Sequence, residues 1–349
     1  MPMSEQALYR KYRPKKFSEV LGQDHVVSAL EGALAQGKTG HAYLFAGSRG
    51  TGKTSLARIF SNQLGVQERD LHEIDAASNR GVDDVRALRE EVHTLPFESP
   101  YKVYIIDEVH MLTKEAFNAL LKTLEEPPQH VVFILATTEQ EKLPDTIVSR
   151  CQSFTFKKPT TKILSEMVRK VAKKEGYKLD TSTAELVALL GAGSFRDAHG
   201  YLQQAIAVSK DKEISREEVE QVTGAPQSAQ LLKLIEAVAT NDLDTALATV
   251  RTFSESGADF KTLLSLILRL VRAVLLVRSS ASMAKQLESE FSEEEYKAIE
   301  RHAKESRTTV NSKFLKALLD AYTYTGTTYT PELSLELALI EHLGEVPHE

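Results

Sequence analysis

The sequence is poor in cysteine and contains no tryptophan, no long apolar run and no excess of positive charge. Its single cysteine excludes an intramolecular disulfide framework and any zinc site built from several cysteines. The net charge of −6 excludes a chain that is polybasic throughout, so any contact with nucleic acid must come from a local patch.

Membrane insertion and secretion are also disfavoured. The most apolar stretch, residues 263–277, contains Arg269 and Arg272 and is shorter than the ~20 apolar residues of a membrane span. Residues 1–17 lack the apolar core of a signal peptide. We therefore expect a buried helix at 263–277 and a soluble, cytoplasmic protein that has no membrane partner.

The apolar pattern changes along the 349 residues and predicts more than one domain. Residues 1–158 alternate strand-like and helix-like runs, which predicts an α/β domain whose parallel sheet is covered by helices on both faces. Residues 159–224 predict a small helical domain, and residues 225–349 a larger all-α domain. The stretch YTYTGTTYT from Tyr322 has a β-like composition, and a helix end followed by a loop is the alternative.

A glycine-rich segment between a predicted strand and a predicted helix matches the phosphate-loop pattern G-x-x-x-x-G-K-[ST]. Glycine lets the backbone fold closely around a phosphate with its N–H groups inward, and the helix N-terminus adds partial positive charge. Lys53 would supply charge to the β- and γ-phosphates and Thr54 a hydroxyl to Mg²⁺. An incidental glycine-rich turn is the alternative. The segment consists of Gly47, Ser48, Arg49, Gly50, Thr51, Gly52, Lys53 and Thr54.

Two acidic residues end the predicted strand KVYIIDE at residues 102–108. Asp107 would hold Mg²⁺ and Glu108 would polarise the attacking water. Thr137 and Thr138 end the next apolar strand, where their hydroxyls would lie near the γ-phosphate or the water. The alternatives are solvated acids at one strand end and ordinary β-forming residues at the other.

Longer segments resemble the AAA+ clamp-loader ATPases, and among them the gamma/tau subunits of bacterial DNA polymerase III. The resemblance rests on LYRKYRP near the N-terminus, HAYLFAGSRGTGKTSLAR at 41–58, EIDAASNRGVDDVR at 73–86, HMLTKEAFNALLKTLEEPP at 110–128 and KLPDTIVSRCQ at 142–152. It is dense over residues 8–226 and mostly architectural beyond them. It implies an AAA+ ATPase domain (1–158), a helical lid (159–224) and a helical collar through which subunits assemble (225–349).

The resemblance gives the phosphate loop and the two acids the same roles and adds three further residues. Thr138 resembles the first sensor. Arg196, in GSFRDA, resembles the second sensor, which reaches from the lid to the phosphates of the same subunit. Arg150 resembles the arginine finger that completes the site of a neighbouring subunit, which makes hydrolysis depend on assembly. The alternatives are an intradomain ion pair for Arg196 and a surface salt bridge for Arg150.

The N-terminal segment around Tyr9, Arg10 and Pro14 matches a family segment that packs beside the nucleotide base. Val20 would complete the base pocket. A basic tail on the protein surface is the alternative.

The implied partners are the other subunits of a pentameric loader ring, a sliding clamp, primer–template DNA and the polymerase III holoenzyme. A ring around DNA would read its shape and backbone, and the candidates for phosphate contact are Asn79, Arg80 and Gly81. A solvated helix start explains these three residues equally. Another AAA+ DNA motor of the branch-migration type and a weakly hydrolysing assembly module are the alternative functions.

The sequence departs from the family at one place. Bacterial members usually carry a four-cysteine zinc module between the phosphate-loop helix and the next strand. Here residues 65–70 fill that gap without a cysteine, and Cys151 lies in the finger segment. ATP and Mg²⁺ are therefore the expected cofactors, and no zinc is expected.

Overall fold

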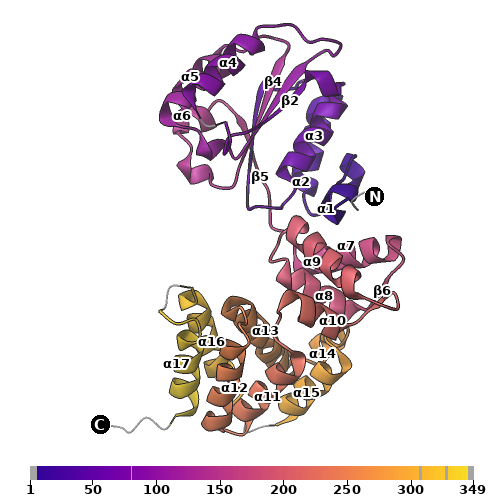
Figure 1. Ribbon diagram of the computed structural model, residues 1–349, viewed down its shortest axis with the longest axis vertical. Coiled ribbons are helices and arrows are strands. Elements are labelled where there is room, and N and C mark those ends of the chain that lie inside the picture. Colours follow the sequence, from indigo (N-terminus) through magenta and orange to yellow (C-terminus); the bar gives the residue numbers. More distant parts are fainter. Residues whose placement is uncertain (1–5, 80, 306–308, 327–328, 345–349) are drawn as a thin grey trace. The chain divides into compact units, whose positions relative to one another are not determined.

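The computed structural model describes residues 6–79, 81–305, 309–326 and 329–344 (Figure 1). The chain divides into two compact units. Unit 1 comprises residues 1–164 and 191–200, and unit 2 comprises residues 165–190 and 201–349. Within the described ranges, none of the helices has the length and apolarity that crossing a membrane requires.

A parallel sheet of five strands lies at the centre of unit 1, in the spatial order β2–β3–β4–β1–β5. The strands are β1 (Ala42–Ala46), β2 (Leu71–Asp75), β3 (Lys102–Asp107), β4 (Val131–Thr137) and β5 (Gln152–Thr155). The register pairs Ala46 with Thr137 and Asp75 with Asp107, so these four strands end at one edge of the sheet. The predicted α/β class with a parallel sheet is confirmed.

Helices cover both faces of this sheet (Figure 1). Because side chains alternate across a strand, Tyr43 and Phe45 of β1 pack with α2 and α3, whereas Leu44 packs with α4, α5 and α6. The described helices of unit 1 are α1 (Leu8–Lys11), α2 (Asp24–Ala35), α3 (Lys53–Gln63), α4 (Val82–Val92), α5 (Lys114–Glu125) and α6 (Asp145–Val148), with 3₁₀ turns η1 (Phe17–Glu19), η2 (Glu68–Asp70), η3 (Val109–Met111) and η4 (Gln140–Lys142).

Sequence analysis, which identifies strands by their apolar runs, does not predict β5. This strand pairs with β1 along one side only and thus forms an edge of the sheet. Phe154 is its one half-buried residue, and the other three are exposed. An edge strand that buries one residue needs no continuous apolar run, which is why its sequence does not resemble those of β1, β3 and β4.

Unit 2 is helical apart from a short parallel pair, β6 (Lys178–Leu179) and β7 (Glu213–Ile214). Helices α7 (Thr161–Lys174) and α9 (Phe195–Val208) contribute residues to both units. The remaining described helices are α8 (Thr181–Leu190), α10 (Arg216–Thr223), α11 (Ser228–Ala239), α12 (Leu243–Glu255), α13 (Phe260–Ser279), α14 (Ala281–Leu287), α15 (Glu293–Lys304), α16 (Ser312–Tyr324) and α17 (Leu333–Leu343), with the turn η5 (Glu288–Glu290).

Two sequence expectations in unit 2 can be compared with these elements. The apolar stretch 263–277 lies within α13, and the Arg269 guanidinium there pairs with Glu185 and lies 4.0 Å from the centre of the Phe291 ring. The buried-helix prediction is therefore confirmed. In the β-like stretch, α16 continues to Tyr324 and no strand forms among its described residues, so the helix-end alternative is correct. Residues 327–328 of this stretch lie outside the described residues.

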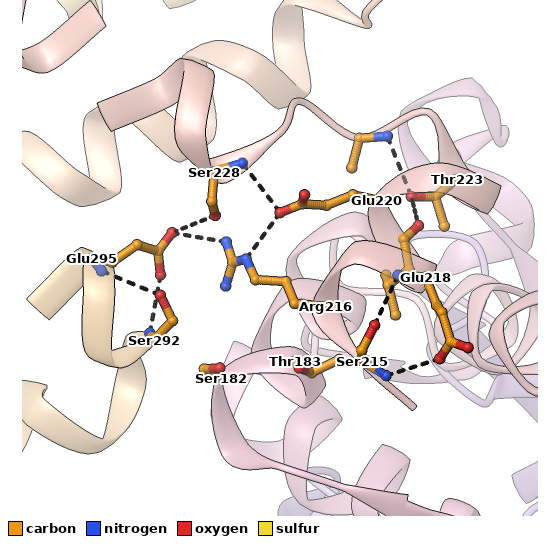
Figure 2. Close-up of polar contacts among 12 residues, drawn as sticks. Ser182, Thr183, Ser215, Arg216, Glu218, Glu220, Thr223, Ser228, Ser292 and Glu295 are labelled. Atoms are coloured by element: carbon orange, nitrogen blue, oxygen red, sulfur yellow. Dashed lines mark hydrogen bonds and ion pairs between the residues drawn. The ribbon is translucent and has the colours of Figure 1, made fainter. Parts of the chain in front are cut away.

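A buried ion network around Arg216 joins α10, α11 and α15 (Figure 2). The Nε of Arg216 lies 3.0 Å from Glu220 Oε1, and the Nη2 of Arg216 lies 2.8 Å from Glu295 Oε1. Glu295 also accepts the backbone N–H of Ser292 at 3.1 Å and thereby closes the N-terminal cap of α15. Ser228 donates its N–H to Glu220 and its hydroxyl to Glu295. Both carboxylates thus have an opposite charge and further hydrogen bonds, whereas Nη1 of Arg216 is buried without a hydrogen-bond partner.

Candidate nucleotide-binding site

The predicted phosphate loop connects β1 to the N-terminus of α3. Gly47 has φ 150°, and a Cβ there would lie 2.6 Å from the carbonyl oxygen of Phe156. Gly52 has φ 102°, and its Cβ position has no other atom within 4 Å. Both positions therefore require glycine, the first for close packing and the second for its backbone angle. The open position at Gly52 leaves room for a phosphate to approach the backbone.

Lys53 turns its ammonium group back onto the loop. Its Nζ donates to the carbonyl oxygens of Gly47 at 2.7 Å and Ser48 at 3.0 Å, and Thr51 Oγ1 donates to the same Ser48 carbonyl at 2.9 Å. The side chain is almost fully buried, and burial lowers the pKa of Lys53, while Glu108 and Asp107 act in the opposite direction. A partly desolvated cation at the mouth of a glycine loop fits the negative charge of a phosphate. Arg49, by contrast, is exposed to solvent.

Thr54 and Asp107 are brought together from the two predicted motifs. Thr54 Oγ1 donates to Asp107 Oδ2 at 2.8 Å, and Asp107 Oδ1 accepts the backbone N–H of Glu108 at 3.0 Å. A hydroxyl and a carboxylate beside a phosphate site are the oxygen ligands that Mg²⁺ takes, with substrate phosphates completing its shell. The residues present therefore fit this ion. Over the described part of the chain, no group of three or more His, Cys, Asp or Glu side chains forms a metal cage.

Glu108 follows β3 in a left-handed backbone conformation, with φ 49°. Such angles are uncommon for residues other than glycine and occur often at functional sites. Its Oε2 accepts the hydroxyl of Thr138 at 3.0 Å and the backbone N–H of Thr138 at 3.3 Å. The carboxylate of Glu108, which is expected to polarise the attacking water, thus contacts Thr138, the residue that resembles the first sensor.

Tyr9 contacts the second-sensor candidate Arg196, and the neighbouring Phe195 donates its backbone N–H to the carbonyl oxygen of Gly50 in the phosphate loop at 2.9 Å. The Arg196 guanidinium lies over the Tyr9 ring, 4.9 Å from its centre, and Arg10 Nε donates to the Tyr9 hydroxyl at 3.1 Å. Pro14 and Val20 are half-buried, and Val20 packs against the core beneath α2 and α3. Arg196 therefore pairs with an aromatic ring and not with a phosphate-loop group in this structure.

Arg150 forms an ion pair with Glu125. Its guanidinium contacts the carboxylate of Glu125 and donates to the carbonyl oxygen of Thr146 at 2.7 Å. Both partners are about one-third to one-half exposed. The salt bridge that the sequence left open as an alternative is thus present, and it holds the side chain at the surface.

The candidates for DNA contact lie before α4. Asn79 is exposed, and its amide donates to the carbonyl oxygen of Asp75 at 3.1 Å. The backbone N–H of Gly81 donates to the carboxylate of Asp84 at 3.1 Å. Arg80 lies outside the described residues.

Gln23 and Arg13 also contact the phosphate loop and α3. Arg13 belongs to the N-terminal segment that matches the family, whereas sequence reasoning did not propose Gln23 as a site residue. Gln23, 1% exposed, donates to the carbonyl oxygen of Lys157 at 2.7 Å and accepts the Lys157 N–H at 3.1 Å. Its Nε2 also lies 3.5 Å from the Thr51 carbonyl oxygen in the phosphate loop. Arg13 Nε donates to Ser55 Oγ on α3 at 2.9 Å. A buried polar side chain leaves no local sequence signal, because its partners lie far along the chain.

Between α3 and β2, residues 68–70 form the turn η2. The buried carboxylate of Asp70 accepts the backbone N–H groups of Phe97 at 2.6 Å, Glu98 at 3.0 Å and Ser99 at 2.9 Å. Burial raises the pKa of Asp70, but these hydrogen bonds outweigh burial and lower it to about 2. The segment so anchored exposes 77% of Leu95 and 72% of Phe97.

Comparisons with known proteins identify the family of this chain. The profile of the family described as "DNA polymerase III, delta subunit" matches residues 22–160, and that of "DNA polymerase III subunits gamma and tau domain III" matches residues 214–347. DNA polymerase III subunit tau of Bacillus subtilis is 40% identical over 85% of this chain and 56% of its own length. DNA polymerase III subunit gamma of Buchnera aphidicola is 34% identical over 86% of each chain.

Two further comparisons bear on length and fold. The chain spans 46% of DNA polymerase III subunit tau of Escherichia coli, which is 40% identical over the matched part, and so about half of the longer relatives. The Thermotoga maritima RuvB Holliday junction branch migration motor has a TM-score of 0.53 and 22% identity, and covers 81% of this chain and 86% of its own. That likeness shows a shared fold alone. The sequence relatives decide the family, and this chain belongs to the DNA polymerase III gamma/tau subunits.

Proposed function

We propose that this chain is an ATP-hydrolysing subunit of a clamp loader, which uses ATP to load a sliding clamp onto primer–template DNA. The observation that carries the proposal is the convergence of Lys53, Thr54, Asp107 and Glu108 at one edge of the sheet in a gamma/tau family member. Ligands of open parallel sheets bind at this edge.

Each residue at the sheet edge has a distinct task in this proposal. The loop N–H groups and the Lys53 ammonium bind the phosphates, which compete for Lys53 with the carbonyl oxygens it now contacts. Thr54 and Asp107, whose side chains meet at 2.8 Å, would hold Mg²⁺, which would supply positive charge to the phosphates. Glu108 orients and polarises the attacking water, and Thr138 fixes the carboxylate that does so.

Two arginines complete the proposed site from outside the loop. Arg196 would leave the Tyr9 ring for the phosphates of its own subunit, and Tyr9, Arg10, Pro14 and Val20 would border the base. Arg150 would leave Glu125 for the phosphates of a neighbouring subunit. A cation supplied by a neighbour makes turnover depend on assembly, since charge develops on the transferred phosphoryl group.

The surface of α17 supports assembly with other subunits, for which we propose the five-membered ring that the resemblance implies. One side of this helix is buried through Leu335, Ala338 and Leu339. The other side still exposes 48% of Leu337 and 44% of Ile340. A helix that is apolar on both sides normally lies between two packing partners. We accordingly assign residues 225–349 to the collar, 159–224 to the lid and 1–158 to the ATPase domain.

Two surfaces of unit 1 are suited to the remaining partners. The segment held by Asp70 presents Leu95 and Phe97 to solvent in a fixed conformation, which suits an apolar pocket on the clamp. Residues 79–81 would contact the DNA backbone. We extend the proposal to membership of the polymerase III holoenzyme and to a cytoplasmic location, for which the family relationship is the support.

Steady-state ATP turnover of the purified full chain tests the proposal. We expect slow turnover alone, and strong stimulation only when primed DNA, a bacterial sliding clamp and the other loader subunits are all present. Glu108→Gln should abolish the stimulated turnover while leaving ATP binding intact. Turnover that ignores clamp and primer, or that accompanies duplex unwinding, would favour a DNA motor. Clamp loading without turnover would favour an assembly module.

A further inference from the structure

The carboxylate of Glu108 has a third polar neighbour besides the two groups of Thr138. His110, in the turn η3, places its Nδ1 3.5 Å from Glu108 Oε2 and 3.0 Å from Thr137 Oγ1. Its Nε2 lies 3.2 Å from Glu139 Oε2. The imidazole therefore connects Thr137, at the end of β4, and Glu139, just beyond it, with Glu108, the acid that follows β3.

These contacts fix the ring with little freedom. The side chain of His110 is 8% exposed. Lys142 also contacts the Glu139 carboxylate, at 2.6 Å, and the hydrogen bond from Lys142 lowers the pKa of Glu139. Thr137 is fully buried, and its hydroxyl oxygen accepts the N–H of Glu139 at 3.0 Å. Both anchors of the ring are thus themselves held by neighbours.

The two ring nitrogens face different groups. Nε2 faces the carboxylate of Glu139, and Nδ1 faces the Thr137 hydroxyl and Glu108 Oε2. Because Thr137 and Glu139 flank the first-sensor residue Thr138, their contacts with the ring hold the nitrogen nearest Glu108 at a set distance from its carboxylate.

We infer that His110 is a positioning residue for Glu108, transmitting the placement of the β4 end to the carboxylate that activates water. The inference rests on the proposed ATPase function and adds a residue to it. A general base acts only within hydrogen-bond reach of the water, so a small rotation of Glu108 costs turnover without weakening the binding of ATP. His110 touches neither phosphates nor metal ligands in this role.

Two substitutions separate the contacts of the ring. His110→Asn keeps a polar atom near the Nδ1 position, which faces Glu108, whereas His110→Gln keeps one near the Nε2 position, which faces Glu139. We expect His110→Gln to lower kcat about 10- to 100-fold, the range that follows loss of a supporting partner. His110→Asn should retain more of the turnover, and the KM for ATP should be unchanged in both.

The matched control is His130→Asn, which alters a histidine at the opposite end of β4. His130 Nε2 lies 3.2 Å and 3.1 Å from the carbonyl oxygens of Val92 and Thr94, remote from Glu108 in the fold. This variant should leave kcat and KM as in the wild type. All variants are assayed as full chains in the complete loader with clamp and primed DNA, beside Glu108→Gln.

The outcomes distinguish the inference from the function on which it rests. Wild-type turnover that depends on Glu108, together with unaltered kcat in both His110 variants, overturns the positioning role alone. A raised KM or lost folding in both variants assigns His110 a purely structural part and also overturns it. Turnover that is indifferent to Glu108→Gln overturns the proposed function itself, and the positioning role with it.

Discussion

Replacing Asp70 by asparagine tests whether a single carboxylate holds the exposed segment of unit 1 in place. The buried carboxylate accepts three backbone N–H groups, from Phe97, Glu98 and Ser99. The asparagine side chain keeps one oxygen, which can still accept the backbone N–H groups of Glu98 and Ser99. Its amide nitrogen then faces the N–H of Phe97, so a charge-assisted hydrogen bond is replaced by two opposed donors.

Two considerations give a similar free-energy cost for Asp70→Asn. Loss of one hydrogen bond to a charged group costs about 1.5–3 kcal/mol. The same hydrogen bonds lower the pKa of Asp70 from 3.8 to about 2, which corresponds to about 2 kcal/mol in favour of the ionised carboxylate in the folded chain. A loss of about 2 kcal/mol should make local opening of residues 94–100 about 30-fold more frequent.

Hydrogen exchange of the full chain, followed by mass spectrometry of peptides covering 94–101, measures this opening. Glu98→Gln is the matched control, because it removes the same charge from the same segment and leaves the Asp70 contacts intact. Equal exchange in wild type and Asp70→Asn, or equal acceleration in Glu98→Gln, would refute the reasoning. Because the folded pKa of Asp70 lies below 3.8, its contribution should be present above that pH and disappear as the pH falls through about 2.

Three further predictions concern other side chains. Glu125→Gln frees Arg150 from a half-exposed ion pair, so unfolding free energy should change by less than about 1 kcal/mol. Turnover of the assembled loader should rise up to about fivefold, and unchanged turnover across subunit concentrations would contradict this. Arg216→Met strands the two buried carboxylates of Figure 2 and should destabilise unit 2 by about 3–5 kcal/mol in urea titrations, with partial recovery when both become glutamine. Burial raises the pKa of Cys151 to about 11, so iodoacetamide should modify the native thiol slowly at pH 7 and faster as the pH approaches 11. A native rate equal to that of the urea-unfolded chain would show the thiol to be unperturbed.

Sequence patterns predict the elements whose residues are contiguous. The phosphate loop needs glycines and a lysine at fixed spacing, and its strand and helix neighbours carry apolar runs of the matching period. Asp107 and Glu108 can be predicted as a pair for the same reason, since two charged residues directly follow the apolar run of a strand that is buried on both faces. The helix after Thr113 also follows from its cap, because Thr113 accepts the N–H of Ala116.

Structural elements and contacts that lack such a local pattern cannot be predicted from the sequence. Strand β5 buries one residue partially, so its sequence resembles a loop. Gln23 connects to Lys157 across 134 positions, and Asp70 to Ser99 across 29. Nothing in a glutamine or an aspartate taken alone tells which backbone N–H groups will surround it after folding.

The sequence by itself therefore determined the class of fold, the phosphate loop and the two acids of the candidate site. Only the tertiary structure decided that Thr138 and His110 surround Glu108, that Tyr9 holds Arg196, and that Glu125 holds Arg150. The physical reason is the distance along the chain over which each kind of interaction acts. Backbone propensity and hydrophobic period act over neighbouring residues, whereas the partner of a polar side chain is chosen by the packing of segments far apart in the chain.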